Sequence, residues 1–165
     1  MVDLCAGAGG KTLALAAAME NRGQLYATDL AARADLVLID APCTGTGAWR
    51  RNPDAKWRVR PGALEQRQKE QAATLDRATA LVKPGGRIAY ITCSVLTEEN
   101  GDQVRNFLAR HPEFAVVPPG VVAGALGERA FLFRRAALMT EEGLLMTPRR
   151  TDTDGFYLSV LVRQS

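Results

Sequence analysis

The chain has 165 residues, 47% hydrophobic and 24% charged, with a formal net charge of +3, a composition that suits one soluble globular domain. No apolar run approaches the ~20 residues of a membrane span and no signal-peptide layout opens the chain, so we expect neither a membrane protein nor an exported one. Three cysteines without a C-x-x-C pair and a single histidine exclude most disulfide scaffolds and zinc sites, and predict a cytoplasmic protein with reduced thiols and no metal.

Apolar runs alternate with glycine-rich breaks along the chain. Strands are predicted at residues 2–5, 23–29, 34–42, 87–95 and 155–163. A helix is predicted directly after the first glycines, at 11–19, and a second runs from Pro61 through Val82 to the breaker "KPGG". Near-continuously apolar strands that alternate with helices indicate an α/β fold with a parallel sheet covered on both faces.

A third helix is predicted from Thr97, whose neighbours Glu98 and Glu99 form an acidic first turn. Its apolar positions, which we expect to face the core, are Val104, Phe107 and Leu108. Further on, "GLLMTP" at 143–148 is a short apolar piece without a predicted structure.

One connection is too short for this fold. Only "LAARA", residues 30–34, separates the predicted strand that ends at Asp29 from the strand that includes Asp35. Parallel neighbours need a crossover of about a dozen residues or more. We therefore predict that a segment is missing near residues 30–34.

The stretch "DLCAGAGGKT" is a glycine-dense turn between a strand and a helix. It is no phosphate-binding loop, because Cys5 stands where that motif needs glycine, and no dinucleotide fingerprint, because Thr12 stands at its third glycine. A compact turn followed by Asp29 at the end of the next strand suits an adenosyl ligand without a pyrophosphate, with Lys11 beside its carboxylate. This favours S-adenosylmethionine; a tight turn that binds nothing is the alternative.

Cys43 in "DAPCTGTG" and Cys93 in "YITCSV" each follow the end of an apolar strand. Open α/β sheets bind ligands at that edge, and the ends of neighbouring strands lie about 5 Å apart. If the two strands are neighbours, both thiols flank one cleft beside Asp40. A lone cysteine is usually a buried structural residue, but two at one edge indicate thiol chemistry.

The segments "DLCAGAGGKT", "DAPCTGTG", "RRNPDAKWR", "KPGGRIAYITCSVLTEEN" and "DTDGFY" together resemble the RNA cytosine-5 methyltransferase family, the NOL/NOP/Sun group. Bacterial enzymes that modify small-subunit ribosomal RNA are the most similar members. The resemblance implies a class I methyltransferase (Rossmann-like) fold, with a doubly wound, mostly parallel sheet of seven strands whose last strand is antiparallel. It implies one catalytic domain over 1–165, without the family's N-terminal RNA-binding region; we expect a monomer, although nothing in the sequence indicates the oligomeric state.

The implied reaction moves a methyl group from S-adenosylmethionine to carbon-5 of a cytosine in RNA, expected to be 16S ribosomal RNA, with transfer RNA as the alternative. Carbon-5 becomes nucleophilic only after a thiolate adds to carbon-6. The resemblance assigns this addition to Cys93 and release of the product to Cys43, while Asp40 can reach both the cofactor and the base. The cofactor contacts then expected are Cys5, Ala6, Gly7, Ala8, Gly9, Gly10, Lys11, Asp29 and Asp40.

The segment "WRRNPDAKWRVR", 49–60, interleaves cations with Trp49 and Trp57. Cations contact phosphates and aromatic rings stack on unpaired bases. The alternative is a solvated loop whose tryptophans pack inward. We predict that the RNA is bound by Arg50, Arg51, Lys56 and Arg58.

Three alternatives remain at this point. Pro42 and Cys43 also match the proline-cysteine pair that DNA cytosine-5 methyltransferases use, so Cys43 is the rival nucleophile. A dinucleotide oxidoreductase on a similar sheet is disfavoured by the failed glycine fingerprint. A catalytically weak RNA-binding module derived from a methyltransferase is the alternative from a different class.

Overall fold

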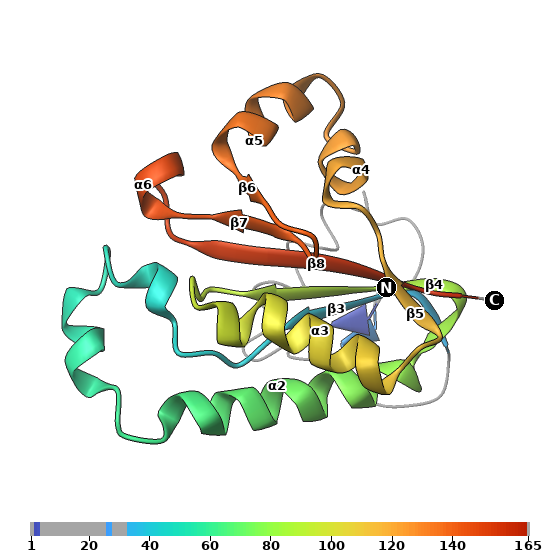
Figure 1. Ribbon diagram of the computed structural model, residues 1–165, viewed down its shortest axis with the longest axis horizontal. Helices are drawn as coiled ribbons and strands as arrows, with labels where there is room; N and C mark the ends of the chain where they lie inside the picture. Colours follow the sequence, from blue (N-terminus) through green and yellow to red (C-terminus); the bar gives the residue numbers. More distant parts are fainter. Residues whose placement is uncertain (1, 4–25, 28–32, 165) are drawn as a thin grey trace.

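Four parallel strands form one half of the sheet in the computed structural model, which describes residues 2–3, 26–27 and 33–164 (Figure 1). These strands are β1 (Val2–Asp3), β2 (Tyr26–Ala27), β3 (Ala34–Asp40) and β4 (Val82–Thr92), in the spatial order β2-β1-β3-β4. β3 and β4 are rich in β-branched and aromatic residues and bury side chains on both faces, which is typical of a parallel sheet interior.

The last strand of the chain, β8 (Phe156–Arg163), lies antiparallel beside β4. The strands β5 (Phe114–Val116) and β7 (Leu144–Met146) are each antiparallel to β8 and so run in the direction of β4, whereas β6 (Leu138–Met139) is antiparallel to β7. All strands of the described residues except β6 and β8 therefore share one direction. The predicted mostly parallel sheet with an antiparallel last strand is confirmed, although the described residues form eight strands rather than seven.

Two helices, α2 (Ala63–Thr79) and α3 (Gly101–Arg110), lie together on one side of the sheet (Figure 1). In α3, Val104 and Phe107 are fully buried and Leu108 packs against the core from a half-buried position, as the sequence predicts. The large side chains at the centre of this core include Ile39, Leu75, Ile88, Tyr90, Tyr157 and Leu161.

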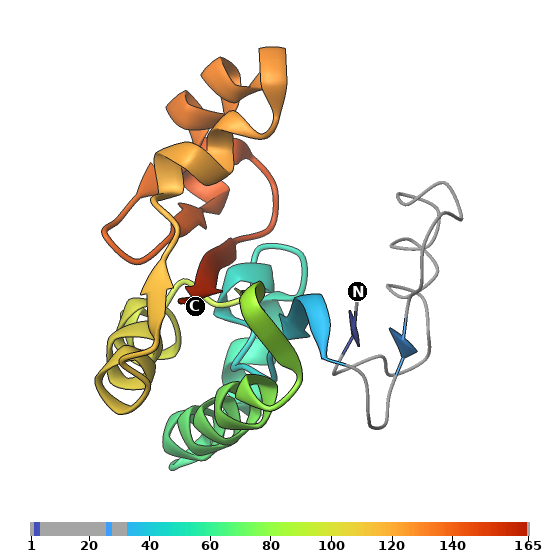
Figure 2. The same cartoon turned by 90° about the vertical axis from the view of Figure 1, so that its right-hand side faces the viewer.

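Short helices between β5 and β8 lie on the opposite side from α2 and α3 (Figure 2). These helices could not be predicted from the sequence, because helices of this length repeat their apolar positions too few times to show a period. They are α4 (Pro119–Gly124), η4 (Gly127–Arg129), α5 (Ala130–Ala136) and α6 (Pro148–Thr151). None of the helices in the described part of the chain is long and apolar enough to cross a membrane.

The prediction at "KPGG" is wrong in its element boundaries. The helix ends at Thr79, and Val82 with the whole of "KPGG" belongs to β4. Pairing with β3 shifts here from Ala34 opposite Val82 to Leu36 opposite Arg87, so the glycines form a bulge inside the strand rather than a break before it.

The helix predicted from Thr97 is also displaced. Thr97–Glu99 forms a separate 3-10 turn, η3, and α3 starts at Gly101. Glu99, the last residue of η3, and Asn100, the one residue between η3 and α3, are buried and hydrogen-bonded to other segments instead of continuing one helix.

The predicted missing segment near 30–34 falls largely on residues outside the described part of the chain. The described strands add one relevant observation: β2 and β3 lie on either side of β1, and only residues 28–33 connect them. That length is below the usual parallel crossover, so the missing segment stays a prediction.

Candidate active site

β3 and β4 bring Cys43 and Cys93 to the same edge of the sheet. Asp40 is the last residue of β3 and pairs with Ile91, and the next amide, of Ala41, donates to the Ile91 carbonyl at 2.8 Å. Because the two strands end at the same level, the residues that follow them meet. The Sγ atoms of Cys43 and Cys93 are 3.3 Å apart, so the predicted convergence of the two thiols is confirmed.

The two cysteines are hydrogen-bonded thiols and not a disulfide, whose sulfur atoms would lie about 2.05 Å apart. The hydrogen bond to Cys93, burial, and the negative charge of an ionised Cys93 all raise the pKa of Cys43 above its usual value. A thiol with a raised pKa keeps its proton to higher pH, so the environment of Cys43 favours its neutral form beside Cys93.

The loop after β3 is bonded directly to the loop after β4. The Thr46 hydroxyl accepts from the Val95 amide and hydrogen-bonds the Ser94 hydroxyl, both at 3.0 Å. The Gly47 amide donates to the Cys93 carbonyl at 2.9 Å. Gly45 has a φ of 70°, in the left-handed region that glycine adopts without cost, and it turns the chain between Cys43 and these contacts.

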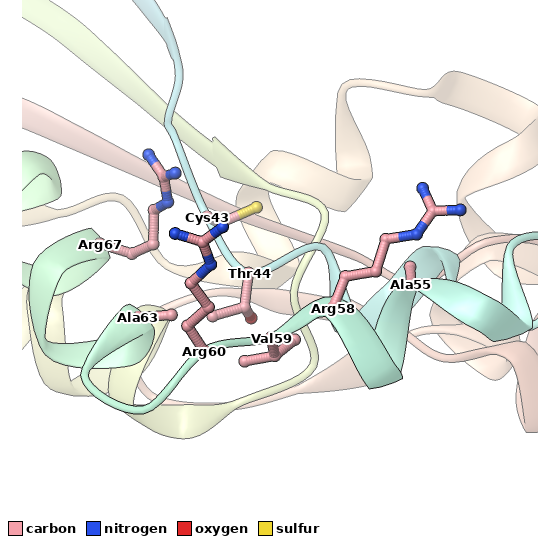
Figure 3. Close-up of a pocket in the computed structure, with 8 residues that line it drawn as sticks. All are labelled: Cys43, Thr44, Ala55, Arg58, Val59, Arg60, Ala63 and Arg67. Atoms are coloured by element: carbon pink, nitrogen blue, oxygen red, sulfur yellow. The ribbon is translucent and has the colours of Figure 1, made fainter.

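A pocket of about 320 Å³ opens beside Cys43 (Figure 3). The guanidinium groups of Arg58, Arg60 and Arg67 all point upward in this view, on either side of Cys43. Three cations around a thiol make the pocket suitable for an anionic ligand such as a phosphate. Its lining residues are Cys43, Thr44, Ala55, Arg58, Val59, Arg60, Ala63 and Arg67.

Arg60 and Arg67 are site residues that the sequence pattern did not predict. Arg67 lies in α2, outside the basic segment, and forms an ion pair with Glu70 at 2.5 Å. It is four residues after Ala63, so both lie on one helical face toward the pocket. The four-residue spacing between Ala63, where the helix starts, and Arg67 is the sequence signal that could have identified Arg67 as a site residue.

Two of the four predicted RNA-binding cations pair with carboxylates near the start of β8. Arg50 lies 3.5 Å from Asp152, and Arg51 lies 2.7 Å from Asp154. Asp152 and the side chains of both arginines are largely exposed, so these pairs are weakly held. They tie the basic segment to the "DTDG" turn while leaving both cations accessible.

The other two predicted cations lie on η2 (Pro53–Arg58). Arg58 pairs with Asp54, and the Lys56 ammonium is 4.8 Å from the centre of the Trp57 ring. Trp57 is 81% exposed, whereas the indole N–H of Trp49 is buried and has no partner among the described residues. Of the two tryptophans, Trp57 is therefore the one that offers a largely exposed ring to an unpaired base.

Asp40 lies at the place where an open α/β sheet binds its ligand. The chain moves from β1 outward to β2 on one side and from β3 to β4 on the other, so the topology reverses between β1 and β3. Asp40 ends β3 at this point, half-buried. The other predicted cofactor contacts, residues 5–11 and Asp29, lie outside the described residues. In the part of the chain that the structure describes, no group of three or more acidic, histidine or cysteine side chains could hold a metal ion.

The fold is that of the class I methyltransferases. The structure superposes on the crystal structure of PH0851 with a TM-score of 0.80 and 34% identity, over 97% of this chain and 41% of that one. It also superposes on a methyltransferase homologue from Pyrococcus horikoshii with a TM-score of 0.61 and 20% identity, over 93% of this chain and 49% of the other, a likeness of fold alone.

Residues 28–162 match the family described as 16S rRNA methyltransferase RsmB/F, and the chain belongs to this family. It is 36% identical over 130 residues to Ribosomal RNA small subunit methyltransferase B of Erwinia tasmaniensis, across 79% of this chain and 26% of that protein. It is 46% identical over 86 residues to the protein of the same name from Salmonella paratyphi B, across 52% of this chain and 20% of the relative. The chain thus spans about a quarter or less of these relatives, and the predicted family and fold are confirmed.

Proposed function

We propose that this chain catalyses transfer of a methyl group from S-adenosylmethionine to carbon-5 of a cytosine in RNA, with 16S ribosomal RNA as the substrate. The names of the family and of the relatives support ribosomal RNA over transfer RNA. The observation that carries the proposal is the 3.3 Å separation of two thiols at the carboxyl ends of adjacent parallel strands.

Cys93 is the nucleophile of the proposed reaction. Its thiolate adds to carbon-6 of the cytosine, forming a C–S bond and moving the ring electron pair toward carbon-5. The raised pKa of Cys43 supports this assignment over the rival one, because the cysteine that keeps its proton is the poorer nucleophile. Asp40 is proposed to assist the addition through a hydrogen bond between its carboxyl group and the ring nitrogen N3.

Cys43 assists release of the methylated product. Once carbon-5 carries the methyl group, loss of its proton to a base lets the electron pair expel the Cys93 sulfur as a thiolate. The Cys43 thiol lies within hydrogen-bond reach of that sulfur and stabilises the departing charge. Without this thiol the covalent RNA–protein adduct should persist.

The place for the cofactor fits the topology described above. Asp40 at the reversal point, together with residues 5–11 and Asp29, would hold S-adenosylmethionine, which supplies an electrophilic methyl group when bound. Arg60 and Arg67, with the four predicted cations, would hold the RNA backbone so that a base turned out of its stack reaches Cys93.

RNA containing 5-fluorocytosine tests this proposal. Fluorine at carbon-5 cannot leave as a proton, so methylation should trap the protein on the RNA as an adduct that survives denaturing electrophoresis. We expect Cys93→Ala to form none, and Cys43→Ala to accumulate adduct on ordinary cytosine RNA. An adduct formed by Cys93→Ala, or none formed by the unaltered protein, would overturn the proposal.

A further inference from the structure

Two consecutive buried residues, Glu99 and Asn100, form hydrogen bonds to the loop that carries Cys43 and to the loop that carries Cys93. Glu99 ends η3 and Asn100 is the one residue between η3 and α3, with 0% and 3% of their surface exposed, and the sequence pattern marked neither as a site residue. The Tyr90 hydroxyl donates to the Glu99 carbonyl at 2.7 Å, which anchors the pair to β4. Two adjacent polar side chains buried this deeply require partners.

Glu99 binds the loop that carries Cys43. Its carboxylate accepts hydrogen bonds from the Thr44 amide at 2.8 Å and from the Thr44 hydroxyl at 2.5 Å. The Gln71 side chain donates to the same carboxylate at 3.0 Å and to the Pro42 carbonyl at 2.9 Å. Both neighbours of Cys43 in the chain are therefore held, one directly and one through Gln71.

Asn100 binds the loop that carries Cys93 in the same manner. Its side-chain amide donates to the Ser94 carbonyl at 3.0 Å, and its side-chain oxygen accepts from the Thr92 hydroxyl at 2.6 Å. These two residues flank Cys93. The residues on both sides of Cys43 are thus held by a network that contains Glu99, and those on both sides of Cys93 by one that contains Asn100.

We propose that Glu99 and Asn100 are positioning residues, of which Glu99 sets the place of Cys43 and Asn100 sets the place of Cys93. The proposal rests on the proposed function for its kinetic readout. Because Cys93 bonds to the base and Cys43 assists release, the two residues control different steps. Loss of Asn100 slows formation of the adduct, and loss of Glu99 slows its breakdown.

The isosteric variants differ in their expected effect. In Glu99→Gln the remaining oxygen still accepts from the Thr44 and Gln71 amides, and the new amide can donate to the Thr44 hydroxyl, so this variant should behave like the unaltered protein. In Asn100→Asp the donor to the Ser94 carbonyl is replaced by an acceptor, so Cys93 should shift. A 1 Å misplacement costs about 100-fold in rate, and we expect that loss in adduct formation.

Single-turnover kinetics with two RNAs separate the steps. Adduct formation is followed on 5-fluorocytosine RNA and adduct breakdown on ordinary cytosine RNA, for Glu99→Ala, Glu99→Gln and Asn100→Asp. Glu98→Ala is the control for Glu99, because the Glu98 carboxylate contacts only the neighbouring Thr97 hydroxyl among the described residues. If a Glu99 variant does not fold, Thr44→Val is measured in its place, because it removes the hydroxyl that donates to Glu99. If Asn100→Asp does not fold, Thr92→Val is measured in its place, because it removes the hydroxyl that donates to Asn100.

The expected result is a split: Asn100→Asp lowers formation alone, and Glu99→Ala lowers breakdown alone, by about tenfold or more. Equal losses in both steps that parallel a fall in melting temperature, or no loss at all, would overturn the positioning role.

A second measurement tests the positioning role without relying on the proposed function. The alkylation rate of each cysteine is measured by peptide mass spectrometry, with Cys5 as internal reference. If the unaltered protein forms no adduct, the methyltransferase chemistry fails. Positioning is then supported by a changed rate at Cys43 in Glu99→Ala and at Cys93 in Asn100→Asp, and overturned if both cysteines respond alike.

Discussion

Gly47 is the position where one added methyl group most directly tests the geometry of the site. It lies in the loop that carries Cys43, buried against the Cys93 loop and the turn before β8: its amide donates to the Cys93 carbonyl at 2.9 Å, and its carbonyl accepts from the Gly155 amide at 2.8 Å. A Cβ at Gly47 would lie 2.4 Å from the Gly155 oxygen and 2.8 Å from the Cys93 oxygen. Gly47→Ala therefore meets backbone on two sides, which no rotamer change relieves.

The size of the effect follows from those distances. Ordinary contact begins near 3.4 Å, so the loops must separate by about 1 Å at Gly155 and by about 0.6 Å at Cys93. Overpacking of this kind costs about 1–3 kcal/mol, which corresponds to a fall in melting temperature of roughly 3–9 °C for a chain of this length. The displacement of Cys93 should lower the rate of adduct formation by about 10–100-fold.

Thermal melting and adduct formation on 5-fluorocytosine RNA measure the two effects. Gly120→Ala in α4 is the matched control, because a Cβ there meets nothing within 4 Å and alanine favours a helix. The control should melt at or slightly above the temperature of the unaltered protein and react at the same rate. If Gly47→Ala matches the control in both melting temperature and rate, the result contradicts the close packing of Gly47 against Gly155 and Cys93.

Four further predictions concern charge and thiols. Cys93→Ala removes the hydrogen bond and charge that raise the pKa of Cys43, so alkylation of Cys43 at pH 8 should become faster; an unchanged rate contradicts the coupling. Arg60→Ala and Arg67→Ala should each weaken RNA binding and reduce the slope of log affinity against log salt by about 0.7, unlike the exposed Arg77→Ala at the far end of α2. Diamide should take one hydrogen from each of Cys43 and Cys93, forming a disulfide and the reduced hydrazine, and a reductant should restore both thiols; failure to link them contradicts their 3.3 Å separation. Burial favours a higher pKa for Asp76, but hydrogen bonds from Arg110 and His111 outweigh it and lower the pKa, so Asp76→Asn should be less stable than the unaltered protein at pH 7, and this difference should shrink as the pH falls through the lowered pKa.

The placement of the two thiols could be predicted from the sequence because it depends on local pattern alone. Two apolar runs end just before Cys43 and Cys93, and parallel strands that pair in register end at one edge. No long-range information beyond the pairing of the two strands was needed. The predicted glycine turn at 5–11 depends on pattern in the same way and stays a prediction.

The network behind the thiols could not be predicted, because its contacts join segments far apart in the chain. Glu99 reads as one more acid in a helical first turn, and only the tertiary structure places it against Thr44, 55 residues earlier. The bulge at "KPGG" is similar: glycine and proline signal a break in any element, and only pairing with β3 shows that the strand continues through it.

The sheet alone does not account for the distance between the sulfur atoms. Neighbouring strands lie about 4.8 Å apart, whereas the Cys43 and Cys93 sulfurs are 3.3 Å apart, so the loops must converge beyond the strand ends. The Gly47–Cys93 and Thr46–Val95 bonds join the loops directly, and the Glu99–Asn100 pair holds both from the buried side. A variant that weakens one of these contacts while leaving the strand pairing intact should therefore separate the thiols without unfolding the sheet, and the pKa of Cys43 should then fall toward its ordinary value.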